Sequence, residues 1–295
     1  MSADANAGAW LVETSRRRLW RDRIARSVLA ATTLVALVPL VLIVYYLLHK
    51  GLAAWSWRLF TTDPNGNFLG DPGGIESAIL GTIEMVALAG AISVPVGVGV
   101  ALYLSEYGRQ SRFANAVRFL IDVLTGVPSI VFGLFIYITL VVTGALGSTS
   151  AAWKGSIALA LLMLPVVTRT AEVVLALVPE ALREAALALG APRWRVLLRV
   201  VLPTALPGIV TGVLLAVARA AGETAPLLFT ATYVQGTTFD LSQRMNSLPL
   251  QIFNDVGQAQ QRLVERAWAA AAVLVAMILI TTLLARLFSH RGRLA

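Results

Sequence analysis

The chain has 295 residues, of which 57% are hydrophobic and 14% are charged, and its mean hydropathy is +0.76. This composition is far more apolar than that of an ordinary soluble domain. The formal net charge of +8 comes from cations at the ends of apolar runs, which favours membrane anchoring over nucleic-acid binding. With no cysteine and two histidines, the chain lacks disulfides, thiolate metal sites and most histidine-based acid–base chemistry.

Six segments are apolar and long enough to cross a bilayer, which takes about 20 residues. They are residues 27–48, 78–103, 117–143, 155–177, 204–231 and 267–288. Because hydrocarbon offers no hydrogen-bond partners, each segment should be a helix. The sequence therefore predicts an all-α integral membrane protein, with one six-helix domain at 27–289 between an N-terminal tail at 1–26 and a short tail at 290–295. We expect residues 1–15 to be weakly ordered.

The cations predict the orientation of the chain. Many arginines precede the first span without the short apolar region and cleavage site of a signal peptide, so that span should be an uncleaved anchor. The richer set of connections contains the N-terminal arginines, Arg109, Arg112, Arg183, Arg193, Arg195, Arg199, Arg291 and Arg293, and the opposite set contains Lys50, Arg58, Lys154, Arg244, Arg262 and Arg266. The richer set should be cytoplasmic. Both termini are then cytoplasmic, and the turn-rich loop at 49–77 is external.

The connection at residues 179–203 is too polar to span a membrane but regular enough to form a short helix. Pro179 suits a first helical position, Glu180 complements the helix dipole, and Gly190 suits the position after the helix end. Pro192 then prevents continuation of the helix. Such a helix outside the bilayer either docks on a partner or is a surface helix without one.

Several ionisable residues fall inside the predicted spans, where each costs on the order of 3 kcal/mol. They are Glu84, Asp122, Arg169, Glu172, Arg219 and Glu223. Arg219 and Glu223 are four residues apart on one helical face, about 16 residues or roughly 24 Å beyond Pro203. Arginine matches the oxygens of a phosphate, and a carboxylate can accept a proton-bearing oxygen. The pair could bind or gate an oxyanion, or it could be a structural ion pair.

The other intramembrane charges carry less weight. Arg169 and Glu172 also share a face, but Arg169 could extend toward the cytoplasmic interface, while Glu84 and Asp122 are expected to cap or pair locally. Five prolines interrupt the predicted spans, at Pro95, Pro128, Pro165, Pro207 and Pro226. Kinked helices often surround a transport path, so the prolines are weakly consistent with transport.

The chain has no recognisable catalytic motif. Neither Lys50 nor Lys154 follows a glycine or precedes Ser or Thr, so there is no P-loop, and no hydrolase elbow or zinc-protease motif is present. ATP hydrolysis, if it drives this protein, must take place on another chain. We therefore expect neither catalytic residues nor metal ligands here.

The 179–203 connection resembles the EAA loop of ABC importer permeases. The matching residues are Glu184, Ala185, Ala186, Gly190, Leu202 and Pro203, with Val200 where the pattern has isoleucine. The resemblance implies that this helix inserts into a cleft of an ATP-binding subunit and transmits closure of the nucleotide sandwich to the spans. Glu184, Ala185, Ala186 and Gly190 are then the coupling residues, and ATP and Mg are bound by the partner, with no cofactor in this chain.

Residues 122–133 and 219–231 resemble signatures of the A-type permeases of phosphate importers, and the resemblance extends from about residue 75 to 288. It implies a MetI-like type I fold in the bacterial inner membrane. The implied partners are a homologous C-type permease, a dimer of ATP-binding subunits and an extracytoplasmic phosphate-binding protein. Arg219, Glu223 and, with less weight, Arg169 would line the phosphate path. Residues 222–226 and 246–250 favour the A type over the C type.

Three alternatives stay open. The EAA loop does not specify a substrate, so the cargo could be another oxyanion such as sulfate, molybdate or phosphonate. The chain could also be a secondary transporter or channel that works without ATP. It could lastly be a membrane anchor that relays phosphate status to a sensor.

Overall fold

The computed structural model describes residues 16–67, 70–108, 111–144, 147 and 149–291, and it leaves the side chains of residues 18 and 287–291 undescribed. The chain divides into two units, Met1–His49 and Lys50–Ala295. In the first, helix α1 (Arg16–Tyr46) contains Pro39 and begins within the segment predicted as a tail. The tail boundary at residue 26 stays a prediction, because a helix can continue beyond a membrane, and the expectation for residues 1–15 lies outside the described residues. The C-terminal tail at 290–295 is described only as far as Arg291, where it continues the last helix.

The described part of the second unit contains helices but no β-strand. The helices are α2 (Trp57–Thr61), α3 (Glu76–Leu102), α4 (Arg112–Gly126), α5 (Ser129–Ile136), α6 (Ala152–Ala176), α7 (Glu180–Ala188), α8 (Arg193–Val196), α9 (Leu202–Ala221), α10 (Ala225–Thr230), α11 (Leu248–Val256) and α12 (Gln261–Arg291). Four π-helical segments are η1 (Leu47–Gly51), η2 (Tyr103–Tyr107), η3 (Tyr137–Val142) and η4 (Leu197–Val201). Segments η2 and η3 extend α3 and α5, and η4 precedes α9.

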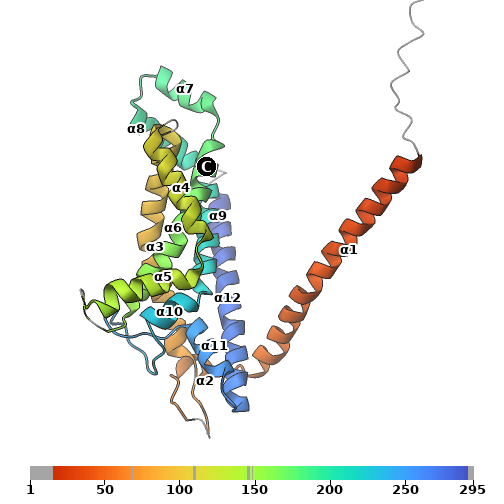
Figure 1. Ribbon diagram of the computed structural model, residues 1–295, viewed down its shortest axis with the longest axis vertical. Helices are drawn as coiled ribbons and strands as arrows, with labels where there is room; N and C mark the ends of the chain where they lie inside the picture. Colours follow the sequence, from red (N-terminus) through yellow and green to blue (C-terminus); the bar gives the residue numbers. More distant parts are fainter. Residues whose placement is uncertain (1–15, 68–69, 109–110, 145–146, 148, 292–295) are drawn as a thin grey trace, which may run out of the picture. The chain divides into compact units, whose positions relative to one another are not determined.

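Five described stretches of helix are long and apolar enough to cross a membrane. They are Leu19–Gly51, Glu76–Tyr107, Ala152–Ala176, Arg193–Ala221 and Gln261–Arg286. The bent pair Arg112–Gly126 and Ser129–Val142 makes a sixth if it counts as one span. The all-α membrane fold is thus confirmed. In the second unit, α3, α6, α9 and α12 run along the long axis, with α7 and α8 at one end and α2 and α11 at the other (Figure 1).

Two of the predicted spans are not continuous helices. The segment at 117–143 bends by 102° between α4 and α5, where Val127 is extended (ψ 130°) because it precedes Pro128. The segment at 204–231 breaks after Ala221, and α10 starts with Pro226 in its first turn. The two short helices after these breaks pack on each other, since a Cβ at Gly133 would lie 2.5 Å from the Cα of Pro226.

Small residues let the central helices approach closely. Gly208 and Gly212 lie one turn apart on α9 and face α6, where a Cβ on Gly212 would come 2.2 Å from Cγ2 of Thr170 and one on Gly208 would come 2.5 Å from Cγ1 of Val174. In lipid, helix association depends on this kind of close packing, because burial of apolar surface gives little net gain there. The α6–α9 contact therefore fixes the middle of the bundle.

A buried polar network joins α11 to α12 at the α2 end. Arg266 donates from Nε and Nη2 to the two carboxylate oxygens of Asp255, each at 2.8 Å, and its Nη1 donates to the carbonyl oxygen of Pro72. Gln251 donates to Asp255 at 2.8 Å and accepts from Asn246 at 2.7 Å. Asp255 is fully buried and Arg266 nearly so, and Arg266 lies within α12 although the pattern of cations placed it in a connection between spans. Each member of the network has its partners, which is what makes its burial tolerable.

Replacement of Asp255 by alanine is expected to destabilise this end of the bundle by about 3–5 kcal/mol, because it leaves the buried Arg266 guanidinium without its counter-charge. The thermal aggregation midpoint of the purified complex measures the effect. The matched control is Asp255→Ala combined with Arg266→Met, which removes both charges and should recover most of the loss. If Asp255→Ala alone were as stable as the unmodified protein, the buried pair with Arg266 would not stabilise this end of the bundle.

Candidate functional site

Arg219 and Glu223 lie together at the point where α9 ends. Nε of Arg219 is 3.7 Å from Oε1 of Glu223, so the structure brings the predicted pair together. Glu223 lies just beyond the helix, in the break between α9 and α10, where its N–H still donates to the carbonyl oxygen of Ala220 at 3.2 Å. The pair therefore occupies a break in a span rather than the middle of a regular helix.

The guanidinium of Arg219 is held loosely. Its side chain is 50% exposed, and it continues an exposed face of α9 that includes Thr211 and Leu215 at intervals of four residues. Within the described residues its one recorded ion pair is the long contact with Glu223. Arginine presents five N–H donors, so most of them remain available. Because charged side chains in spans rarely face lipid, this face of α9 is suited to a water-filled path or a subunit boundary.

Arg169 is, by contrast, fixed between two carboxylates. Its Nε donates to Oδ1 of Asp122 at 2.9 Å and its Nη1 donates to Oε2 of Glu172 at 2.9 Å. Arg118 donates from Nε to the other oxygen of Glu172 at 2.7 Å and from Nη2 to the carbonyl oxygen of Leu104 at 2.8 Å. These contacts tie α4 to α6 and to η2. We call the set Arg118, Asp122, Arg169 and Glu172 the α4–α6 charge cluster.

The α4–α6 charge cluster corrects the expectation that Asp122 pairs locally, because its partner is on another helix. The sequence analysis did not single out Arg118, although its spacing of four residues from Asp122 places both on one face of α4. With two arginines and two carboxylates the cluster has no net charge. Arg169 is thus less available to an incoming oxyanion than Arg219.

Replacement of Arg169 by glutamine should lower by about tenfold the transport that the family resemblance implies, because it removes the ion pairs to Asp122 and Glu172 that tie α4 to α6. The double variant Arg169→Gln with Asp122→Asn should recover part of that activity, since no unpaired charge is left. ATP-dependent uptake at equal membrane levels measures both variants. If the double variant is as inactive as the single one, Arg169 acts on the substrate directly and not through the cluster.

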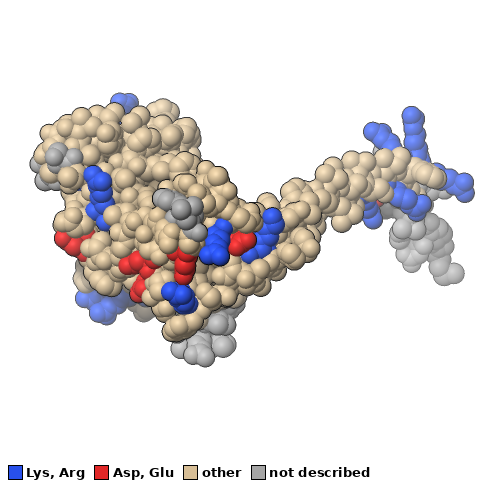
Figure 2. All heavy atoms as spheres, turned by 90° about the horizontal axis from the view of Figure 1, so that it is seen from below, with Lys and Arg blue, Asp and Glu red and all other residues tan. Residues whose placement is uncertain are grey.

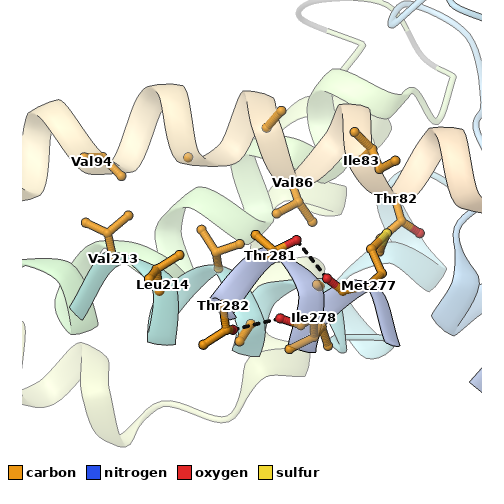
Figure 3. Close-up of a pocket in the computed structure, with 15 residues that line it drawn as sticks. Thr82, Ile83, Val86, Val94, Val213, Leu214, Met277, Ile278, Thr281 and Thr282 are labelled. Carbon is orange, nitrogen blue, oxygen red and sulfur yellow. Dashed lines mark hydrogen bonds between the residues drawn. The ribbon is translucent and has the colours of Figure 1, made fainter. Parts of the chain in front are cut away.

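A cavity of about 280 Å³ lies between α3, α9 and α12 (Figure 3). Its wall is mainly aliphatic, and three of its polar groups are satisfied within their own helices. The hydroxyl groups of Thr82, Thr281 and Thr282 donate to the carbonyl oxygens of Ala78, Met277 and Ile278. A phosphate that enters a site must replace the hydrogen bonds that it loses with water. A site with so few free donors does not provide them. The cavity therefore does not replace Arg219 as the candidate oxyanion site.

Helix α7 has the geometry predicted for the coupling loop. Gly190 has φ 77° and its N–H donates to the carbonyl oxygen of Leu187, while the N–H of Ala191 donates to that of Ala186. This pair of bonds is a Schellman motif, and it explains why a glycine follows the helix. Pro179 precedes the helix as its cap instead of filling its first position, a shift of one residue. Glu184 and Ala185 are exposed, whereas Ala186 packs against the core formed by α6, α8 and α9.

The face at the α2 end carries exposed charges of both signs (Figure 2). Hydrogen bonds from Ser242 hold the pKa of Asp240 below its usual range, and burial raises the pKa of Tyr233. At neutral pH Asp240 is therefore ionised and Tyr233 is neutral.

In the described residues no three His, Asp or Glu side chains converge in a way that could hold a metal ion.

Comparison with known proteins identifies the family. The model of the family described as "Binding-protein-dependent transport system inner membrane component" matches residues 93–293. The chain is 41% identical over 291 residues to the phosphate transport system permease protein PstA of Yersinia pestis, covering 97% of each chain. It is 42% identical to PstA of Pasteurella multocida, covering 83% of this chain and 86% of that one. It is 39% identical to PstA of Mycobacterium leprae, covering 90% and 87%.

Solved structures show the same fold at low sequence identity. One is a chain of a bacterial ABC transporter involved in the import of the acidic polysaccharide alginate, with a TM-score of 0.65, 17% identity and coverage of 93% of this chain and 99% of that one. Another belongs to the MetNI methionine ABC transporter in an inward-facing conformation, with a TM-score of 0.55, 20% identity and coverage of 73% and 93%. The likeness confirms the expected ABC permease fold. The chain belongs to the family of binding-protein-dependent transport system inner membrane components and, within it, to the PstA permease proteins.

Proposed function

We propose that this chain is a transmembrane permease subunit of an ATP-driven importer of inorganic phosphate in the bacterial inner membrane. The observation that carries the proposal is the similarity to PstA proteins of several bacteria over nearly the whole chain. The geometry is consistent with it, because Arg219 presents unused donors at a break in a span. Arginine binds phosphate oxygens well and stays charged at any physiological pH.

In this proposal Arg219 contacts the phosphate during its passage, and Glu223 holds the guanidinium and accepts from a protonated phosphate oxygen. Hydrogen phosphate has such a proton at neutral pH, whereas sulfate does not. The carboxylate therefore favours phosphate over sulfate, because it accepts a hydrogen bond from hydrogen phosphate and repels sulfate. Arg169 supports the path from the α4–α6 charge cluster.

In this proposal the two ends of the bundle bind different partner proteins. The exposed face of α7, with Glu184 and Ala185, docks on an ATP-binding subunit that holds ATP and Mg and carries out hydrolysis. Basic residues in the α7 connection support a cytoplasmic location for this end, and the charge pattern of the sequence supports the same location for both termini. The α2 end receives an extracytoplasmic phosphate-binding protein, and a homologous C-type permease completes the path. The bundle itself then extends over 27–289, with the coupling loop at 179–203.

The test is uptake of labelled phosphate by cells that lack other phosphate importers and express the full complex with or without this subunit. We expect uptake that depends on this subunit and on ATP, and that excess sulfate does not compete. Competition by sulfate, molybdate or phosphonate would instead favour a permease for another oxyanion. Uptake that continues without the ATP-binding subunit would favour the ATP-independent transporter.

A further inference from the structure

Helix α7 rests on the bundle through one buried side chain. Of its residues Glu180–Ala188, only Arg183 is buried, with 6% of its side chain exposed. Ala186 is half-buried on the same face, and the others are exposed. Burial of an arginine is costly unless its donors are paired, so its contacts determine how α7 is held.

The guanidinium of Arg183 first closes the end of α6. Its Nη2 donates to the carbonyl oxygen of Leu175 at 2.9 Å, and its Nη1 donates to that of Val178 at 2.7 Å. Leu175 lies in the last turn of α6, where carbonyl groups have no partner within the helix, and its oxygen also accepts from the N–H of Val178 at 3.3 Å just beyond the helix end. A cation at the carboxyl end of a helix is also favoured by the helix dipole. Arg183 therefore binds α7 to the last turn of α6.

The same guanidinium also reaches the end of the α3 span. Nη2 of Arg183 lies 3.0 Å from Oε1 of Glu106 in η2, the π-helical segment that continues α3. Within α7, Nη1 lies 3.2 Å from Oε2 of Glu180, which has a 58% exposed side chain. One side chain thus joins three elements, of which α3 and α6 form the core of the bundle.

The surroundings of Arg183 leave room for movement. A polar cavity of about 230 Å³ borders it, lined by Glu106, Tyr107, Glu180, Arg193 and Leu197 among others. Nε of Arg183 is buried without a hydrogen-bond partner. Apart from the contact of Ala186 with the core, the inner side of α7 is therefore held by the directed hydrogen bonds of Arg183 beside a cavity. A planar guanidinium keeps its donors in a fixed geometry, so a shift of α7 would be passed to both helix ends together.

We propose that Arg183 is the positioning residue that links the coupling helix to α3 and α6, with Glu106 as its anchor on α3. This rests on the proposed function, since it assumes that α7 docks on an ATP-binding subunit. Movement of α7 upon nucleotide closure then pulls on the last turn of α6 and on η2, and the spans change state. Loss of the link lets α7 follow the ATPase without moving the spans.

The test compares phosphate transported per ATP hydrolysed in proteoliposomes that contain the full complex and the binding protein. Arg183→Gln should keep binding-protein-stimulated ATPase activity but lower this ratio by about tenfold, in the range typical of coupling between sites. Glu106→Gln should lower it by a smaller factor, because the bonds of Arg183 to α6 remain. Arg183→Lys should restore part of the ratio, because its ammonium can still pair with Glu106. A purely structural role would lower the amount of complex recovered and leave the ratio unchanged.

Arg112→Gln is the matched control, because it removes an exposed arginine at the same end of the bundle. Its ratio should equal that of the unmodified complex. If Arg183→Gln does not assemble, Glu106→Gln decides the outcome, and a normal ratio in that variant overturns the link. If the unmodified complex itself transports no phosphate, the proposed function fails, which is a different result from normal transport that is insensitive to both variants.

Discussion

Replacement of Arg219 by glutamine is expected to abolish phosphate uptake, with a loss of about 100-fold or more, while the complex still assembles. Glutamine keeps some hydrogen-bonding capacity but loses the charge and the planar fork that match two phosphate oxygens. The Arg219 side chain is half-exposed and makes one long ion pair, so its removal costs little folding free energy. A transport defect without an assembly defect therefore separates a substrate role from a structural one.

Uptake of labelled phosphate at equal membrane levels measures this effect. Arg286→Gln is a suitable control, because it removes another exposed arginine from a span helix far along the chain, and it should leave uptake unchanged. Arg219→Lys should give an intermediate rate, since a lysine keeps the charge but not the fork. Normal uptake by Arg219→Gln would mean that Arg219 only holds Glu223, which was the alternative interpretation of the pair.

Features determined by local sequence were predictable. Helix α7 follows from nearby residues, since Gly190 supplies the left-handed position of the Schellman motif and Pro192 prevents further helix. The spans follow from composition, because lipid forces an apolar segment of sufficient length to be helical. The spacing of Arg219 and Glu223 also predicted their proximity correctly. Each of these inferences required no knowledge of what lies across the bundle.

The breaks in the spans depended on residues distant in sequence. Pro95 and Pro165 lie inside continuous helices, whereas Pro128 and Pro226 stand at breaks. A proline removes one donor in either setting, so the residue type alone does not distinguish them. At the breaks, α5 and α10 pack against each other, with Gly133 in contact with Pro226. That mutual packing cannot be seen in either segment alone.

The partners of the charges inside the bundle were hidden for the same reason. Asp122 and Arg169 are 47 residues apart, and Arg183 and Glu106 are 77 apart. A single sequence shows that each charge must be compensated, since an uncompensated one is too costly inside a bundle. It does not show which of several opposite charges does so. The structure supplies that choice, and with it the α4–α6 charge cluster and the link through Arg183.

Reversal of charge at Glu184 is expected to abolish coupling to ATP, with uptake reduced by about 100-fold or more, because a lysine there would place a wrong charge in the docking contact. Glu184 is exposed on α7, and exposed substitutions seldom change stability by much, so the chain should still insert and fold. The measurements are ATP-dependent uptake and co-purification of the ATP-binding subunit. Asp22→Lys, the same reversal of charge at an exposed position on α1, should retain both. The Glu184 variant should differ from Arg183→Gln in what it loses. It should lose the partner or its stimulated ATPase activity, whereas Arg183→Gln should keep both and lose only transport per ATP.

Normal uptake by Glu184→Lys would exclude this face of α7 as the docking contact. The transmission of force through Arg183 would then have no source.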